Sequence, residues 1–232
     1  MEPKETESYR HELKYLISQG QLQLARARLA PLMGPDPHAG PEGMYRIRSL
    51  YFDDRYDTCL RENLDGTDPR EKFRVRIYNH STQRIRLECK EKRRGMTRKT
   101  ACPLTEAQTR LLMAGIPPGD LENQPPLLRR LTVQMMTRGV RPVVIVEYDR
   151  IPYVYPLGNV RVTLDTGISS CRAVDRFLDE TLPRRPVLPI GQELLEVKYD
   201  GFLPDFLHRS LQMPDLRQTA FSKYAICRSY TR

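Results

Sequence analysis

The stretch KFRVRIYN (residues 72–79) alternates basic and apolar side chains. Successive side chains of an extended strand point to opposite faces of a sheet, so Phe73, Val75 and Ile77 share one face. The basic residues of the stretch share the other face. The pattern predicts a strand with one face in the hydrophobic core and one cationic face.

The same alternation recurs in five further stretches. Their charged faces carry Arg10, Glu12 and Lys14; Arg46 and Arg48; Arg84, Arg86, Glu88, Lys90 and Lys92; Arg161 and Asp165; and Glu196 and Lys198. An antiparallel sheet with one solvated side would explain any one of these strands, but not the repetition of long cations on strand after strand. If the sheet closes into a barrel, cations that face its lumen are costly unless an anion neutralises them. The pattern therefore predicts a lumen for a polyanion such as a triphosphate, with glutamates that could hold a divalent cation.

Strands dominate the predicted organisation. Alternation predicts strands at about residues 9–17, 44–53, 72–79, 84–92, 96–102, 142–150, 159–165, 193–199 and 222–229. Capping residues and apolar spacing predict helices after Ser18 and Thr105, over 125–138 and over 204–212. We expect an α+β or barrel-like chain that forms one domain over residues 1–232.

Composition points to an anionic partner. The chain has 38 Lys and Arg against 29 Asp and Glu, a net charge of +9, which favours nucleic acid, a phospholipid surface or a phosphorylated small molecule. Nucleic acid is the weakest of these, because aromatic stacking platforms are sparse and tryptophan is absent. Five scattered cysteines without a CxxC motif predict a reducing, cytoplasmic location. We expect no membrane segment in this chain, because its aliphatic runs are short.

Several common catalytic patterns are missing from the sequence. The four histidines lack the spacing of metal ligands, and no Ser–His–Asp or Cys–His arrangement can be argued from spacing. There is also no GxxxxGK[ST] loop. A bound nucleotide would therefore be held by side chains rather than by a glycine-rich phosphate loop.

Eight motifs in order carry a more specific resemblance. They are RHELKYLI, LYFDD followed by Tyr56, FRVRIYN, LECKEK, VEYDRIPYV, VRVTLDT, LEVKYDGFLP and FSKY, from about residue 8 to residue 228. This succession resembles the VTC (vacuolar transporter chaperone) domain, the catalytic domain of eukaryotic polyphosphate polymerase. That family belongs to the triphosphate tunnel metalloenzymes, together with the CYTH phosphatases and RNA triphosphatases.

The resemblance implies a closed antiparallel β-barrel, the triphosphate tunnel, with a few peripheral helices and with Mn²⁺ or Mg²⁺ as cofactor. Carried over position by position, the residues expected to act in catalysis are Arg74, Arg76, Lys90, Arg161 and Lys223. Those expected to bind substrate are Lys14, Arg48, Lys99, Arg150, Lys198 and Ser222. Glu196 matches the metal-binding glutamate of the family, with Glu12 or Glu88 as further candidates. Arg10 stands where an ExExK pattern would begin, which favours polyphosphate chemistry over that of the CYTH phosphatases.

The function implied is a polyphosphate polymerase that transfers the γ-phosphate of ATP to a growing polyphosphate chain. Phosphoryl transfer needs in-line positioning and stabilisation of negative charge, which a ring of cations and a metal supply. Two alternatives use the same tunnel: a metal-dependent hydrolase of triphosphate or polyphosphate, and a binding module without turnover. ATP and inorganic polyphosphate or triphosphate are the expected partners.

Overall fold

One antiparallel sheet forms most of the computed structural model, which describes residues 10–230. Its main strands are β1 (His11–Ser18), β3 (Tyr45–Asp53), β4 (Arg70–Tyr78), β5 (Ser81–Arg93), β6 (Met96–Leu104), β7 (Arg141–Tyr155), β8 (Val160–Cys171) and β10 (Gln192–Tyr199). The strand order is β1-β10-β8-β7-β3-β4-β5-β6. Short strands β2 (Gly34–Pro35) and β9 (Arg185–Pro186) pair with β7 and β8. The α+β class predicted from the sequence is confirmed.

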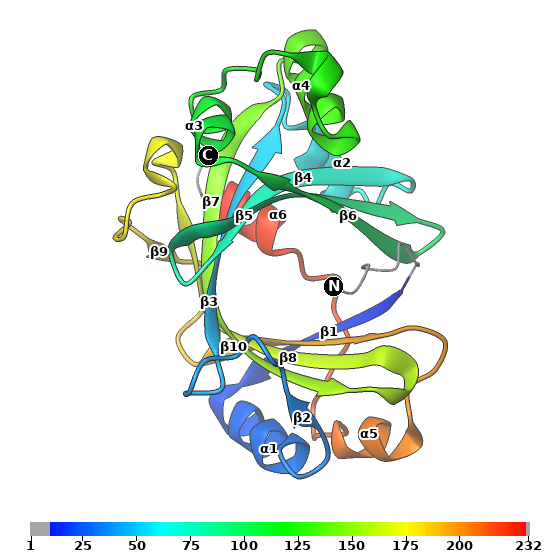
Figure 1. Ribbon diagram of the computed structural model, residues 1–232. Coiled ribbons are helices and arrows are strands. Elements are labelled where there is room, and N and C mark those ends of the chain that lie inside the picture. Colours follow the sequence, from blue (N-terminus) through cyan, green and yellow to red (C-terminus); the bar gives the residue numbers. More distant parts are fainter. Residues whose placement is uncertain (1–9, 231–232) are drawn as a thin grey trace.

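The sheet curls strongly but stays open (Figure 1). Its two edge strands approach each other at one isolated pair, Arg10 and Thr97, whose backbone N–O distances are 3.0 and 3.3 Å. A closed barrel requires a continuous ladder between the first and last strands, and among residues 10–230 no such ladder joins β1 to β6. The predicted closed barrel is therefore wrong in this respect: the sheet is a half-barrel with a concave face.

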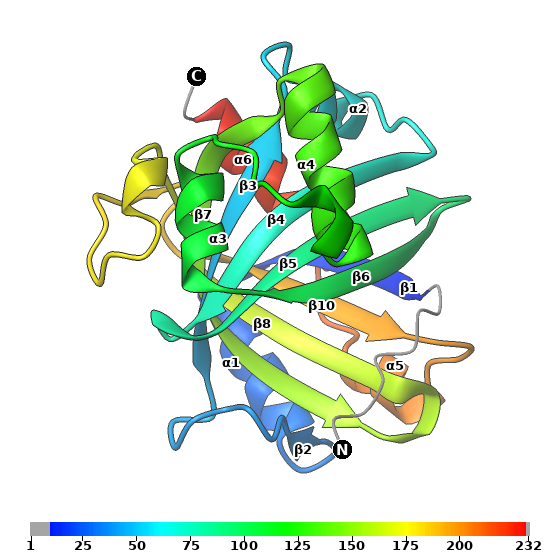
Figure 2. The ribbon, with the colours of Figure 1, turned by 45° about the horizontal axis from the view of Figure 1, so that its top comes forward.

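The helices lie on both sides of this sheet. They are α1 (Gln19–Leu29), α2 (Thr58–Leu64), α3 (Glu106–Met113), α4 (Pro126–Arg138), α5 (Asp205–Ser210) and α6 (Lys223–Ser229). Helices α3 and α4 cover β4, β5 and β6 from outside, while α1 and α5 lie outside the half that contains β1, β8 and β10 (Figures 1 and 2). Capping boxes at Ser18 and Thr105 start α1 and α3, as predicted. Gly139 ends α4 with a φ of 65°, which glycine adopts without strain.

Helix α6 corrects a second prediction, because residues 222–229 were expected to form a strand. The Ser222 side chain accepts a hydrogen bond from the Ala225 backbone N–H and caps the helix. Tyr224, Ala225 and Cys227 are buried against the concave face. Their spacing fits one face of a helix better than the period of two of a strand, and α6 lies inside the curve of the sheet (Figure 1).

The core divides between the two faces of the sheet. Outside, Phe73, Val75 and Ile77 pack in a cluster with residues of α3 and α4, which confirms the face predicted from the opening stretch. A second outer cluster lies under α1 and α5. Inside, α6 packs on apolar residues of β3 and β7, including Ile47 and Val144. The rest of the concave face is left to charged side chains. No helix within residues 10–230 has the length and apolar character needed to cross a bilayer.

Candidate anion-binding cavity

One wall of the concave face is built by β4, β5 and β6 around Glu88. The Glu88 carboxylate lies 2.7 Å from Arg74, 3.6 Å from Arg76 and 3.5 Å from Lys99, measured between charged atoms. Burial opposes ionisation of Glu88, which is 1% exposed, but Arg76 and Arg74 outweigh it and hold its pKa well below the usual value. Glu88 is thus enclosed by cations, and its main structural effect is to hold the two arginines side by side.

The opposite wall is built by β1, β7, β8, β10 and α6 around Glu196. Lys198 and Lys223 each place their Nζ 2.8 Å from this carboxylate. Arg150 approaches it to 3.4 Å and Lys14 to 3.9 Å. Burial opposes ionisation of Glu196, but the lysines dominate and keep its pKa well below the usual value. The wall therefore carries an ionised carboxylate among four cations.

Asp165 is a second carboxylate of this wall. It lies 2.6 Å from both Arg150 Nε and Lys223 Nζ and is fully buried. Tyr148 supports the same two cations, since Lys223 Nζ lies 4.8 Å and Arg150 Cζ 5.3 Å from its ring centroid. Asp165 and Tyr148 therefore hold Arg150 and Lys223 in position.

The two walls meet through Glu12 on the edge strand β1. Its carboxylate lies 2.5 Å from Lys90 of β5 and 3.6 Å from Lys198 of β10. A cavity of about 340 Å³ opens here, lined among others by Lys14, Lys72 and Ser222. Side chains thus bridge the two walls near the gap that the backbone leaves open.

Positive charge exceeds negative charge in this cluster, which we call the basic cavity. Nine of its cations are Lys14, Lys72, Arg74, Arg76, Lys90, Lys99, Arg150, Lys198 and Lys223, and four carboxylates lie among them, Glu12, Glu88, Asp165 and Glu196. These thirteen groups carry an excess of five positive charges when all of them are ionised, and Arg70 and Lys92 at the edge add to it. Such an excess in a buried place is unfavourable without an anion.

The pKa values of two lysines in the basic cavity are lowered. Burial, together with nearby Lys90 and Lys14, lowers the pKa of Lys72 well below its usual value. Burial also lowers the pKa of Lys90 to about 8, although Glu12 opposes this shift. The Lys72 ammonium donates to Asn63 Oδ1 at 2.7 Å and lies 3.4 Å from the Ser222 hydroxyl. A bound polyanion would favour the charged form of both lysines.

Two of the predicted residues lie apart from this cluster. Arg161 is on the concave side of β8, but it pairs with Asp36 at 2.5 Å and donates to the Tyr45 hydroxyl at 2.5 Å. Arg48 points to the convex face, where it pairs with Glu147 and donates to the carbonyl oxygens of residues 177, 179 and 180. The structure therefore does not bring Arg48 to the basic cavity, and it corrects the expectation that Arg48 lines the lumen.

Sequence reasoning missed four residues of the cavity as site residues. These are Lys72, Asp165, Asn63 and Tyr51. The sequence did indicate the face on which Lys72 and Asp165 lie, because each alternates along its strand with a predicted site residue, Arg74 or Arg161. Tyr51 accepts a hydrogen bond from Arg74 at 2.9 Å, and it lies in a stretch that reads as a core strand. Asn63 belongs to α2, a helix that the sequence did not indicate.

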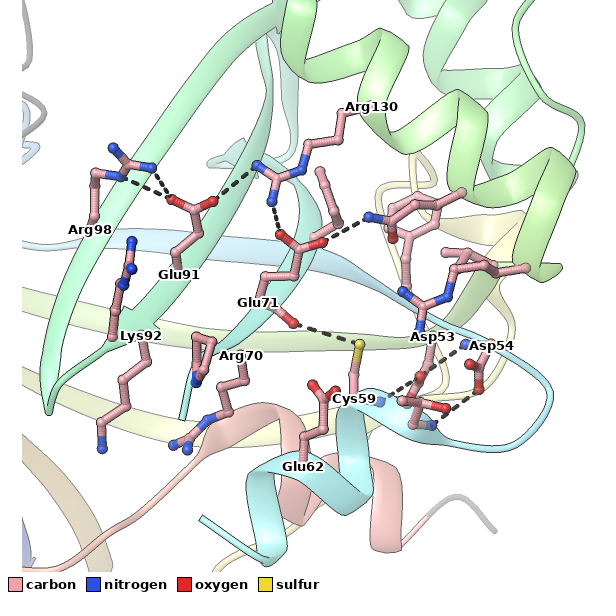
Figure 3. A pocket seen from close by; sticks show the side chains of 18 residues that line it. Asp53, Asp54, Cys59, Glu62, Arg70, Glu71, Glu91, Lys92, Arg98 and Arg130 are labelled. Carbon is pink, nitrogen blue, oxygen red and sulfur yellow. Dashed lines mark hydrogen bonds and ion pairs between the residues drawn. The ribbon is translucent and has the colours of Figure 1, made fainter. Parts of the chain in front are cut away.

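A cluster that contains acidic residues lies on the convex side, in another cavity of about 480 Å³ (Figure 3). Glu71, Cys89 and Glu91 place possible ligand atoms within 4.8 Å of one another. Arg130 pairs with both glutamates, and Arg98 pairs with Glu91. Burial and Glu71 raise the pKa of the Cys89 thiol to about 12. These groups already neutralise one another, so the cluster suits a structural role better than a metal site.

An antiparallel, strongly curled sheet with ion-paired arginines and lysines on its concave face matches the fold expected of the triphosphate tunnel class broadly, although the sheet is open. The chain belongs to the VTC domain family, whose model matches residues 9–231. The resemblance inferred from the motifs is confirmed. Membership in this family supports a tunnel enzyme that acts on triphosphate or polyphosphate.

Two solved structures are similar to this chain. One is a putative adenylyl cyclase from Hippeastrum, reported to have a dominant triphosphatase activity; it is 15% identical, with a TM-score of 0.56 and 97% of both chains covered. Another is a putative adenylate cyclase from Bacillus halodurans, also 15% identical, with a TM-score of 0.49 and 87% of this chain and 84% of that chain covered. No curated protein matches the sequence.

Proposed function

We propose that this protein is a polyphosphate polymerase that transfers the γ-phosphate of ATP to the end of a polyphosphate chain in the basic cavity. The observation that carries the proposal is the gathering of cations from both walls of the half-barrel on its concave face, beside a cavity lined by Lys14, Lys72 and Lys90. Such an arrangement supplies what phosphoryl transfer requires, namely positioning and stabilisation of negative charge.

The proposed roles follow from the two walls. Arg74 and Arg76 would bind phosphate oxygens, because guanidinium groups make bidentate contacts with phosphate and Glu88 already holds this pair together. Lys90 would leave Glu12 to contact a phosphate placed between the walls. Lys223 and Arg150, fixed by Asp165, would meet the phosphates from the other side. No separate covalent nucleophile is needed, because an oxygen of the terminal phosphate of the chain attacks the γ-phosphorus of ATP, the bond to the β–γ bridging oxygen breaks, and ADP leaves.

The carboxylates of the second wall fit Mn²⁺ or Mg²⁺. Both ions prefer oxygen ligands, and Mg²⁺ is commonly held by one or two carboxylates together with substrate phosphates. Glu196 and Glu12 share the neighbours Lys14 and Lys198 and so lie close together. We propose that these two glutamates hold the ion, which would supply charge neutralisation to the transferred phosphate. Glu88 suits this role less, since it lies on the opposite wall, where it pairs with Arg74, Arg76 and Lys99 rather than with the neighbours that Glu196 and Glu12 share.

A hydrolase is the second candidate. It would use the same cavity but deliver water to the phosphorus, and the reported triphosphatase activity of the Hippeastrum protein favours it. Incubation of the purified protein with ATP and Mn²⁺, with products separated on a gel, tests both. For the proposed polymerase, we expect long polyphosphate chains that an added phosphatase degrades. Orthophosphate alone would favour the hydrolase, and binding without consumption of ATP would favour a binding module.

A Glu196→Gln variant should lower metal-dependent turnover about 100-fold or more, because the substitution removes a charged metal ligand and keeps the shape of the side chain. Rates at saturating Mn²⁺ measure this effect, with far-ultraviolet circular dichroism as the folding check. Glu106→Gln on α3 is the control, since Glu106 lies on the surface and pairs with Arg110. Unchanged turnover in Glu196→Gln would remove Glu196 from the metal site.

Ligand binding should take up protons near pH 8. Burial lowers the pKa of Lys90 to about 8 in the free protein, and a bound polyanion raises the pKa of a neighbouring ammonium group. A fraction of the lysine that is neutral before binding is thus charged afterwards, and affinity falls as the pH rises above this value. Calorimetry with tripolyphosphate in two buffers of different ionisation enthalpy measures the uptake.

The matched variant is Lys90→Arg, which keeps the charge but does not titrate in this range. It should take up fewer protons than the wild-type protein. Equal heats in the two buffers for the wild-type protein would contradict the predicted uptake.

A further inference from the structure

Cations face each other across the β4–β5 ladder on the concave side. The directly opposed like-charged residues are Arg76 with Arg86, Lys72 with Lys90, and Arg70 with Lys92. In this series Arg74 directly faces an acid, Glu88, and Lys90 and Arg76 form further ion pairs with Glu12 and Glu88. Like charges directly opposite each other destabilise a sheet, so the series is unfavourable for the protein without a ligand. It is favourable where an extended polyanion lies along the ladder.

The outermost of these pairs, Arg70 and Lys92, lies at the mouth of the basic cavity. Both residues line the 340 Å³ cavity and also border the convex cavity beyond the strand ends. Figure 3 shows their side chains pointing away from Glu91 and Arg130. The pair therefore stands where a chain would leave the interior of the half-barrel.

These two cations have few partners of their own. Within the described part of the chain, no carboxylate forms an ion pair with Arg70 or Lys92; Arg70 donates to the Thr67 carbonyl oxygen at 2.6 Å. The nearby acid, Asp68, accepts hydrogen bonds from the backbone N–H groups of Arg94 and Gly95, at 2.9 and 2.8 Å. The hydrogen bond from Gly95 contributes most to lowering the pKa of the Asp68 carboxyl group, and Lys92 and Arg70 still act on it electrostatically and help to lower it. Without a direct ion pair, however, the charge of Arg70 and Lys92 is less neutralised than that of Arg74 or Lys223.

The series is longer than a triphosphate. Arg76 and Arg70 are six residues apart on one strand, which corresponds to about 20 Å at the rise of an antiparallel strand. A triphosphate bound at Arg74 and Arg76 would leave the outermost pair without a phosphate. A chain of many phosphates would reach it.

We propose that Arg70 and Lys92 form an outer binding position for inorganic polyphosphate longer than a triphosphate. The proposal rests on the proposed function, because it places the inner end of the chain at Arg74 and Arg76. It adds that the protein distinguishes long chains from short ones by this outer pair. The pair holds the growing chain as it leaves the cavity.

The test compares tripolyphosphate with longer polyphosphate chains in equilibrium binding to an Arg70→Ala/Lys92→Ala variant. We expect affinity for the long chains to fall about tenfold, the effect of losing two partly exposed charged contacts. The dependence of long-chain affinity on salt should become shallower by about one unit of logarithmic slope for each cation removed. Affinity for tripolyphosphate should stay within twofold of the wild-type value, a difference of about 0.4 kcal/mol.

The control removes two charges elsewhere, in Arg26→Ala/Arg129→Ala. Both residues are exposed, on α1 and α4, and neither ligand should bind differently. The melting temperature of the Arg70→Ala/Lys92→Ala variant should not fall, because the substitution removes repulsion. A milder variant, Arg70→Gln/Lys92→Gln, repeats the comparison if the first variant unfolds.

The outcomes separate the two proposals. Equal loss of affinity for short and long chains, or no loss for either, would overturn the outer position while leaving the basic cavity in place. A wild-type protein that binds neither ligand would instead overturn the proposed function. A selective loss for long chains supports both.

Discussion

An Arg74→Ala/Arg76→Ala variant is expected to bind tripolyphosphate about a thousandfold more weakly than the wild-type protein, because two charge-assisted contacts worth about 2 kcal/mol each are lost. Both guanidinium groups are largely buried and already oriented by Glu88, so they meet the ligand at little entropic cost. Isothermal titration calorimetry measures the affinity.

Two further variants make this result interpretable. Arg74→Lys/Arg76→Lys keeps both charges and removes bidentate contacts, so its affinity should lie between those of the wild-type protein and the alanine variant. Arg26→Ala/Arg129→Ala removes two surface charges and should leave the affinity unchanged. A folded alanine variant that retains full affinity would show that the two arginines do not bind the ligand.

Arg48→Met should lower the free energy of unfolding by about 3 kcal/mol, the cost of breaking a buried ion pair and its hydrogen bonds. Arg48 is 1% exposed and donates to three backbone carbonyl oxygens of the segment that follows β8. Methionine fills a similar volume but leaves those carbonyl groups and Glu147 with fewer partners. Denaturant unfolding measures the change.

Arg46→Met is the matched control on the same strand. Arg46 pairs with Asp149 and is 36% exposed, so its loss should cost less than about 1 kcal/mol. Tripolyphosphate affinity should stay unchanged in both variants, because both side chains face away from the basic cavity. Weak ligand binding by a stable Arg48→Met protein would indicate that Arg48 contributes to the binding site and would contradict this expectation.

Alternation in the sequence predicted the main strands and most of the charged residues that the structure brings to the basic cavity, because one face of each strand packs in the core. For β4 and β5 the apolar residues Phe73 and Leu87 leave no doubt about which face is inside the core. In β3, apolar side chains occur on both faces, with Ile47 packed inside the curve and Leu50 outside it. The orientation of Arg48 therefore depends on the tertiary structure.

Other features depend on contacts between distant segments. Helix α6 forms because Tyr224 and Ala225 pack inside the curve of the sheet, although the sequence around them alternates as a strand would. The opening between β1 and β6 is a property of the whole sheet, since closure depends on the tilt and stagger of all strands. Asn63 reaches Lys72 from α2, a contact between elements that no local pattern predicts.

The crystal structure of this protein grown with tripolyphosphate would test the central claim most directly. We expect the anion inside the half-barrel, with phosphate oxygens within hydrogen-bond distance of Arg74, Arg76 and Lys90, and with Lys90 released from Glu12. An anion bound only on the outer surface, with the ion pairs of the concave face unchanged, would contradict the account.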